Sequence, residues 1–298
     1  MRHDLTSLKL FVVVAECGNL TRAAEREHLA VSAVSKRITD LEEQIGSVLL
    51  QRHARGVSLT PAGHSLLQHA RQILQMLQRM DADMGEYAQG VKGNIRLHAV
   101  ASALMQFLPE EIETFLDKHP LVNIGLVEQT GPMVVQSVLD GGADLGIVVG
   151  QTPVSGVSLF PYRRDRLVLG VPLGHPLAGR KSVRFHELAE FPFIGPHAGS
   201  SLAVLLAAAE KSGNITLKQR VQASSFDAMC RLVEIRLGLT ILPDGVLAPY
   251  VKTGRLGMVT LKEAWAVRQL HLVVRNPEQL NPVAGVLLAH LGISMESS

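Results

Sequence analysis

The chain has few aromatic residues and few cysteines, and both scarcities limit what it can do. Aromatic side chains make up 4% of the 298 residues, which argues against stacking platforms for single-stranded nucleic acid. Cys17 and Cys230 are far apart in the sequence, so they have no metal-ligand spacing and cannot belong to a dense disulfide framework. They are typical of reduced thiols in a cytoplasmic protein.

Long apolar runs and targeting signals are also missing. No apolar run approaches the length of a membrane span, and the N-terminal segment MRHDLTSLKL lacks the apolar core of a signal peptide. We therefore expect a cytoplasmic protein with no membrane partner.

Catalytic and metal-binding signatures are absent from the sequence as well. The 12 histidines form no metal or catalytic set. His64 and His69, for example, are not spaced as i, i+4 ligands on one helix face. There is no G-x-S-x-G, no phosphate-binding loop, no zinc spacing and no pair of carboxylates for acid–base work. We expect a protein that is not an enzyme and that needs neither metal nor cofactor.

The bulk composition is that of a globular protein. Hydrophobic residues make up 47% of the chain and charged residues 19%, which permits a full core. The length suggests about two domains. The net charge of +2 is too small to demonstrate a nucleic-acid partner, so any case for one rests on where the charges lie.

The first 60 residues have the pattern of a winged helix-turn-helix. A first amphipathic helix stops at Gly18, Thr21 is placed to cap a short second helix, and Ser32 to cap a third. Three short helices with a tight turn between the last two indicate a helix-turn-helix. Short β-like runs at 48–51 and 57–60 then predict a hairpin.

A long helix is predicted after this domain, over residues 61–90. Thr60 and Pro61 are a suitable cap and first residue, and apolar residues recur at heptad spacing through residues 62–88, which favours a coiled-coil seam between two copies of the chain. The alternative is that the stripe packs on its own domain. The seam is formed by Gly63, Leu66, Ala70, Ile73, Leu77, Met80, Met84 and Tyr87.

From residue 91 to residue 298 the sequence alternates strand-like and helical segments. Such alternation predicts an α/β fold with largely parallel sheets, in one large sheet or in two small lobes. Ligands of open α/β sheets bind where strand ends meet helix N-termini. The strand candidates are 95–100, 122–127, 144–149, 166–171, 191–195, 238–243 and 269–274, and the helix candidates are 104–118, 132–140, 202–211 and 226–237.

Residues 5–63 resemble the DNA-binding domain of LysR-type transcriptional regulators. The resemblance is carried by ordered motifs across this segment and continues, more weakly, to the C-terminus. One departure is Val31, which stands where the family often has a base-contacting glutamine; an apolar side chain there suits contact with a thymine methyl group. The N-terminal motifs are Ala15-Glu16 with Gly18-Asn19-Leu20, Ala23-Ala24, Ala33-Val34-Ser35, Leu41-Glu42 with Ile45-Gly46, and Leu59-Thr60 with Ala62-Gly63.

This resemblance implies an N-terminal winged helix-turn-helix and a C-terminal two-lobed domain like that of periplasmic binding proteins. Lobe I would comprise about 94–162 and 270–298, and lobe II about 163–269. The expected partners are double-stranded promoter DNA and a second copy of the chain through residues 62–88, in a dimer or a tetramer. A small-molecule effector (a co-inducer) would lie between the lobes, and RNA polymerase is a further partner that the resemblance allows.

The expected site residues follow from these two domains. On the third helix and the hairpin, the expected DNA contacts are Ser32, Ser35, Lys36, Arg37, Arg52 and Arg55. Each of these also has a simpler interpretation as a solvent-exposed side chain. Around the expected cleft, the effector-binding candidates are Ser102, Thr130, Ser200, Ser201 and Phe226. Ordinary helix capping and core packing are the simpler interpretations here, because serine and threonine cap helices widely.

Three other functions compete with a regulator. A solute-binding protein would account for the α/β half alone, but it would need an export signal. A cytoplasmic α/β enzyme would need a nucleophile or a cofactor motif after a strand. An architectural DNA-binding protein shares the first domain, and stabilisation by a ligand would distinguish it from a regulator that senses an effector.

Overall fold

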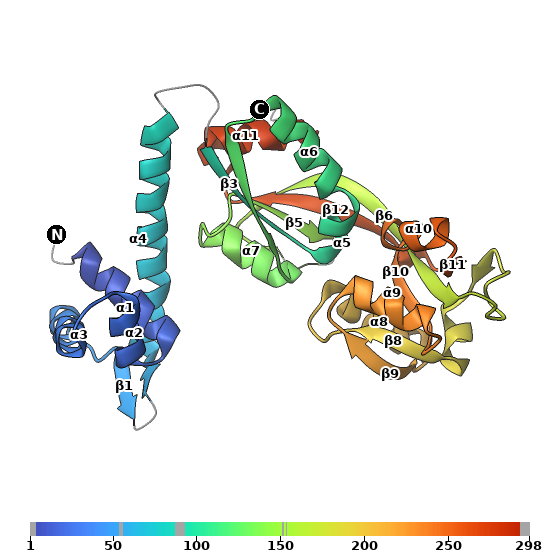
Figure 1. Ribbon diagram of the computed structural model, residues 1–298, viewed down its shortest axis with the longest axis horizontal. Coiled ribbons are helices and arrows are strands. Elements are labelled where there is room, and N and C mark those ends of the chain that lie inside the picture. The colour runs from blue at the N-terminus through green and yellow to red at the C-terminus, as the bar shows by residue number, and fades with distance from the viewer. Residues whose placement is uncertain (1–3, 54–55, 87–92, 151, 153, 293–298) are drawn as a thin grey trace. The chain divides into compact units, whose positions relative to one another are not determined.

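The computed structural model describes residues 4–53, 56–86, 93–150, 152 and 154–292 (Figure 1). The chain forms two compact units, one built chiefly from the first 88 residues and the other chiefly from the rest. Among the described residues, no helix has both the length and the apolar character needed to cross a bilayer.

The N-terminal unit is a small helical domain with one hairpin and one long helix. Its core is formed by apolar side chains of the first three helices, closed by the hairpin and by the start of the long helix. We call the hairpin β1–β2 the wing. The elements are α1 (Leu5–Cys17), α2 (Leu20–Arg26), α3 (Val31–Ile45), β1 (Leu50–His53), β2 (Gly56–Leu59) and α4 (Pro61–Glu86).

The helix ends of this unit partly differ from the sequence-based predictions. Gly18 ends α1 in the left-handed conformation, with φ of 60°, as predicted. The cap of α2 is Asn19 and not Thr21, because the Asn19 side chain accepts hydrogen bonds from the amides of Thr21 and Arg22. Helix α3 begins at Val31 without a side-chain cap, so Ser32 lies within its first turn. The first error arises because Asn19 and Thr21 both suit a cap and stand two residues apart. The second arises because α3 begins after Ala30, which has no capping side chain, and so takes Ser32 into its first turn.

Two glycines allow backbone segments of this unit to approach closely. A Cβ on Gly63 in α4 would lie 2.2 Å from the carbonyl oxygen of Leu49, and a Cβ on Gly56 in the wing would lie 2.2 Å from that of Gly18. The amide of Val57 donates to the same Gly18 oxygen at 2.8 Å. The wing is therefore fixed to the end of α1, and α4 to the segment that precedes the wing.

The C-terminal unit has two lobes, each with its own core (Figure 1). Lobe I has its core in 95–149, Tyr162 and 270–291, and lobe II has its core in 167–266. The elements of lobe I are β3 (Gly93–Ala99), α5 (Ala101–Gln106), α6 (Leu108–Lys118), β4 (Val122–Glu128), α7 (Gly131–Leu139), β5 (Leu145–Val149) and α11 (Pro282–His290). Lobe II contains β7 (Ser182–Val183), β8 (Pro192–Pro196), α8 (Ser201–Gly213), β9 (Lys218–Ala223), α9 (Phe226–Glu234), β10 (Thr240–Pro243), α10 (Asp244–Lys252) and β11 (Leu256–Leu261).

Two long strands, β6 (Ser158–Pro172) and β12 (Val267–Val274), join the lobes. Strand β6 pairs with β12 through its first part and with β10 and β11 through its second part, in each case antiparallel. Strand β12 is also antiparallel to β5. The expectation of largely parallel sheets is therefore wrong, because the sheets are mixed: among the strands of this unit that the structure describes, β3–β4, β3–β5, β8–β9 and β7–β11 pair in parallel and the other pairs are antiparallel. The chain passes from lobe I to lobe II on β6 and returns on β12, so these two strands run in opposite directions.

The sheet of lobe I has helices on both faces, and its strand β5 is buried on both sides. Leu145 and Ile147 of β5 pack with the core under α6 and α11, whereas Val148 packs against α7 on the other face. The expected helix over 104–118 is divided at Phe107 into α5 and α6. Pro109, which lies directly after this break, suits the first turn of α6.

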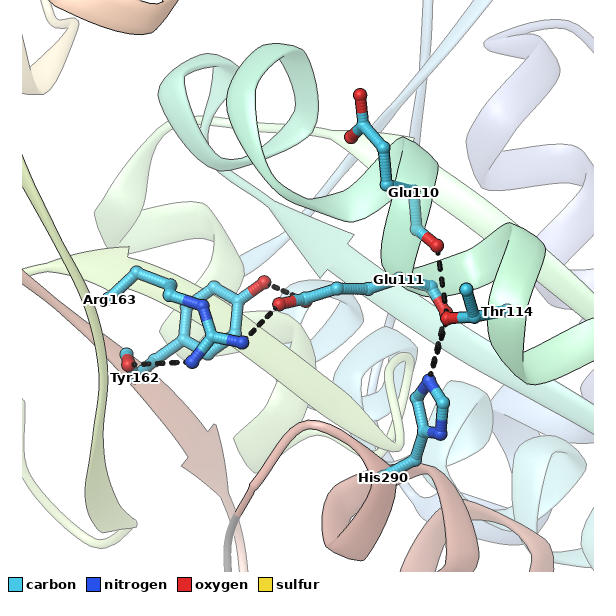
Figure 2. A network of polar contacts seen from close by, with 6 residues as sticks. All are labelled: Glu110, Glu111, Thr114, Tyr162, Arg163 and His290. Atoms are coloured by element: carbon cyan, nitrogen blue, oxygen red, sulfur yellow. Dashed lines mark hydrogen bonds and ion pairs between the residues drawn. The ribbon is translucent and has the colours of Figure 1, made fainter.

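A polar network fixes the outer helices of lobe I to β6 (Figure 2). Glu111 of α6 accepts hydrogen bonds from the Tyr162 hydroxyl and from Arg163 Nη2, the latter at 2.6 Å. His290 of α11 contacts the Thr114 hydroxyl at 3.1 Å. Burial, followed by the hydrogen bond to Glu111, raises the pKa of Tyr162. These side chains are accounted for by their mutual contacts and belong to the scaffold.

Candidate DNA-binding and effector-binding sites

Helix α3 presents one buried and one exposed face. Val34, Ile38 and Leu41 are buried in the core of the N-terminal unit. Lys36 and Arg37 project from the opposite face and are exposed. This division arises from the helical period, since residues spaced by three or four lie on one side.

The cations of this face differ in their partners. Arg37 Nη1 lies 3.5 Å from Asp4 Oδ2, between two exposed side chains, and such pairs contribute little in water. Lys36 has no acidic partner among the residues that the structure describes. Both cations are therefore accessible to a phosphate group.

The wing supplies a further cation next to α3. Arg52 on β1 is exposed, and its Nη1 donates to Ser35 Oγ at 3.2 Å. Ser32 and Val31 are exposed in the first turn of α3. The expected contact Arg55 lies outside the described residues. The described candidates thus share one side of the domain, formed by the start of α3 and by the wing.

Helix α4 uses the first part of its apolar stripe inside its own domain. Ala70 is fully buried in the core of the N-terminal unit, and Leu66 packs against that core. Ile73 and Met76 remain 42% and 67% exposed, so an apolar surface is still available further along the helix. The side chains of Met80, Met84 and Tyr87, which complete the expected seam, lie outside the described part of the chain.

A cavity of about 390 Å³ lies between the two lobes. We call it the interlobe cavity. The ends of β3 and β4 and the start of α5 form the lobe I side, and the starts of α8 and α9 form the lobe II side. All five sequence-predicted effector residues line it, namely Ser102, Thr130, Ser200, Ser201 and Phe226.

The lining hydroxyl groups are not equally available to a ligand. Ser200 Oγ accepts from the amide of Ala203 at 3.1 Å and donates to the carbonyl of His197 at 3.0 Å, so it caps α8 as the simpler interpretation holds. The hydroxyl groups of Ser102, Thr130 and Ser201 make no hydrogen bond to another residue in the described part of the chain. Phe226 supplies an apolar wall and also packs against the core of lobe II.

Five polar lining residues were not predicted from the sequence: Glu128, Gln129, His197, Ser224 and Arg268. Gln129 follows the end of β4 and is hydrogen-bonded to His98 and Ser137. Arg268 lies on β12, which begins at Val267, before the expected start of that strand at residue 269. An arginine at the edge of an apolar strand was the available signal for it. The described residues contain no group of three or more His, Cys, Asp or Glu arranged to hold a metal ion.

The chain matches two family models. Residues 5–64 match the bacterial regulatory helix-turn-helix protein model of the lysR family, and residues 88–295 match the LysR substrate binding domain. The RuBisCO operon transcriptional regulator of Allochromatium vinosum is 30% identical over 96% of this chain and 94% of its own length. An uncharacterized HTH-type transcriptional regulator of Escherichia coli, YbhD, is 28% identical over 95% of this chain and 89% of its own.

Solved structures show the same fold. Full-length CbnR in complex with its target DNA matches with a TM-score of 0.75 and 22% identity, covering 97% of this chain and 99% of that one. The effector-binding domain of QuiR in complex with shikimate matches with a TM-score of 0.59 and 21% identity, covering 67% of this chain and 95% of that one. With both domain models matched in order, the chain belongs to the LysR family and is a DNA-binding transcriptional regulator with an effector-binding domain, not an enzyme.

Proposed function

We propose that two copies of the chain bind a partly palindromic promoter site and that an effector in the interlobe cavity changes how they bind it. The single observation that best supports the effector half is that residues from both lobes, chosen from sequence alone, line one cavity. A ligand that contacts both lobes binds one arrangement of them more tightly than others, and so shifts the population between arrangements.

On the DNA, the start of α3 enters the major groove and the wing contacts the adjacent backbone. Residues at the start of a recognition helix reach base edges, and this assigns Ser32, Ser35, Lys36 and Arg37 to the groove. Arg52 and Arg55 of the wing contact phosphate or a narrow minor groove. Val31, which is exposed at the first position of α3, contacts a thymine methyl group.

Pairing of two chains through residues 62–88 places two recognition helices on one site. Half-sites would then be spaced by about one helical turn, or by a multiple of it. The exposed Ile73 and Met76 support an interface on the second half of α4. Two such dimers form a tetramer, in which an effector-dependent change in the lobes alters the arrangement of the DNA-binding domains and access of RNA polymerase.

The effector is a small molecule with hydrogen-bond acceptors at one end and an apolar body. Hydroxyl groups of Ser102, Thr130 and Ser201 provide the donors, and Phe226 provides an apolar wall. The solved relatives that support a small-molecule ligand are the effector domain of QuiR with shikimate and the regulatory domain of Synechocystis CcmR with 2-PG.

Binding of the full-length protein to DNA upstream of its own gene and of the divergent neighbour tests the first half. Wild type, Arg37→Ala and Arg220→Ala are compared across a salt series. Arg220 is an exposed arginine of lobe II and is the charge-matched control. We expect steeply salt-dependent binding that Arg37→Ala weakens and Arg220→Ala does not. Equal binding by all three proteins would exclude α3 as the DNA contact.

A further inference from the structure

A buried ion pair lies where the two crossing strands meet. Asp165 on β6 and Arg268 on β12 are direct partners in the antiparallel register. Their side chains are 0% and 4% exposed. Arg268 Nε donates to Asp165 Oδ1 at 2.8 Å, and Nη2 donates to Oδ2. Removing two charges from water is costly, and replacing such a pair with apolar residues often stabilises a protein, so its presence here calls for a reason other than stability.

Arg268 is only partly satisfied by this pair. The guanidinium group has five N–H donors in a planar fork, and Asp165 occupies the edge formed by Nε and Nη2. Nη1 has no acceptor among the residues that the structure describes. Because Arg268 lines the interlobe cavity, the wall of that cavity contains a nearly buried arginine with N–H donors that Asp165 does not use.

The position of the pair is set by Gln106, the last residue of α5. Gln106 Nε2 donates to Asp165 Oδ2 and to the carbonyl oxygen of Ser102, each at 3.0 Å. Its Oε1 accepts from the amide of Gly245 in lobe II at 3.1 Å. The side-chain amide of Gln106 thus holds Asp165 in place beside Arg268, fixes the helical turn that bears Ser102, and contacts lobe II.

We propose that Arg268 is the residue of the interlobe cavity that selects the charge of the effector, and that the effector carries a single carboxylate group. Nη1 of Arg268 donates to one carboxylate oxygen, and the hydroxyl groups of Ser102 and Thr130 donate to the same group. Glu128 also lines the cavity and is exposed. Its charge repels any anion, and more strongly as the ligand's negative charge rises, so among anions that bind the Arg268 donors a monocarboxylate is disfavoured least. The inference rests on the proposed effector site and goes beyond it by naming the charge of the ligand.

The test uses the full-length protein and a panel of small monocarboxylates, each paired with its primary amide and with a dicarboxylate analogue. Thermal shift finds the members that bind, and calorimetry gives their dissociation constants. Wild type is compared with Arg268→Lys, and with Arg164→Lys as the matched control. Arg164 lies on the same strand as Asp165, is exposed, and donates to Gln269 outside the cavity lining. Near-UV circular dichroism checks that each variant is folded.

We expect monocarboxylates to bind at least tenfold more tightly than their amides and dicarboxylates. Arg268→Lys should remove most of this preference, because an ammonium group cannot hold Asp165 through two parallel bonds and also present a second edge. Arg164→Lys should leave the preference intact. Acids and amides that bind wild type equally, or a panel in which no acid binds, overturn the inference.

Two further measurements separate this inference from the effector site itself. If the ligands that bind are neutral and Thr130→Val and Ser201→Ala abolish their binding, the interlobe cavity is the effector site but Arg268 does not select the charge of the effector. If Arg268→Lys, Thr130→Val and Ser201→Ala all leave the affinity of a ligand unchanged, that ligand binds elsewhere, and the result contradicts the proposed effector site as well. Bromide soaked into wild-type crystals gives a test that needs no variant. We expect an anomalous peak in contact with Arg268 Nη1. Bromide peaks elsewhere and none at Arg268 would contradict the proposal.

Discussion

Arg52 of the wing donates a hydrogen bond to the hydroxyl group of Ser35 on α3, with 3.2 Å between Nη1 and Oγ. The two residues are 17 positions apart in sequence, and this contact places the wing cation beside the first half of the recognition helix. The side chains of Ser35 and Arg52, one on α3 and one on the wing, are therefore held in a fixed relative position before DNA binds. We expect this contact to make the contributions of Ser35 and Arg52 to DNA binding interdependent.

A double-mutant cycle measures this dependence. Arg52→Ala should weaken promoter binding and lower the salt slope by about one, as for loss of one phosphate contact. Ser35→Ala should weaken binding less, and the two effects should not add, because side chains in contact are energetically coupled. Additive losses would show that Arg52 reaches the DNA without help from Ser35.

The side chain of Asn19 caps α2, and its removal is predicted to destabilise the N-terminal unit. Asn19→Ala should lower the free energy of unfolding of the N-terminal unit by about 1 kcal/mol, because it leaves two amides at the start of the helix without an acceptor. Thr21→Ala is the matched control and should change stability by a few tenths of a kcal/mol at most, since the Thr21 side chain caps nothing. Urea unfolding followed by circular dichroism measures both, and a larger loss for Thr21→Ala would reverse the assignment.

The exposed apolar side chain of Ile73 is predicted to lie in the interface between two chains. Ile73→Glu should shift the protein toward the monomer, because a charge at an apolar seam is left without water or a partner. Gln68→Glu adds the same charge at an exposed position of the same helix and should leave the oligomeric state unchanged. Sedimentation velocity over a concentration series decides, and an Ile73→Glu protein with the wild-type distribution excludes this interface.

Gly63 and Gly285 are predicted to respond to alanine in opposite directions. A Cβ on Gly63 would lie 2.2 Å from the Leu49 carbonyl oxygen, whereas a Cβ on Gly285 meets nothing within 4 Å. Gly63→Ala should destabilise the protein by roughly 2 kcal/mol or more, since backbone must move. Gly285→Ala, within α11, should stabilise it by about 0.5–1 kcal/mol. Thermal unfolding of both variants checks this, and a neutral Gly63→Ala would contradict the close approach of α4.

The ion pairs of Glu234 predict a pH dependence of stability. Hydrogen bonds from Arg255, followed by those from Arg231, lower the pKa of Glu234 to about 2 from its ordinary value of 4.5. A depressed carboxylate pKa contributes stability that is present above the ordinary value and is lost as the pH falls toward 2. The melting temperature of Glu234→Gln should therefore lie below that of wild type at pH 7, and the difference should shrink between about pH 4.5 and pH 2. A difference that is constant with pH would rule out the charge of Glu234 as its cause.

Local pattern in the sequence predicted the elements of the N-terminal unit, and the family resemblance pointed to the residues that line the interlobe cavity. The heptad and helical periods identify buried faces directly, and the glycine that ends α1 has a conformation that its neighbours in sequence require. Ser102, Thr130 and Ser201 were found because strand-to-helix turns carry ligands in α/β folds. The family resemblance then indicated that these turns face one cleft.

Contacts between distant residues were decided by the tertiary structure. The direction of β6 and β12 depends on which lobe each end joins, and no local period records that, so the sheet was wrongly expected to be largely parallel. Arg268 looks in the sequence like an ordinary residue near the end of a strand. Its place in the cavity lining depends on pairing with Asp165, 103 residues away. The sequence alone predicted the helices and the hairpin of the N-terminal unit and part of the later elements, because backbone hydrogen bonding and side-chain period act locally; it did not predict β7, β9, β11, α10 or α11. The placement of Arg268 beside the interlobe cavity was decided by strand pairing, which brings together residues remote in the chain.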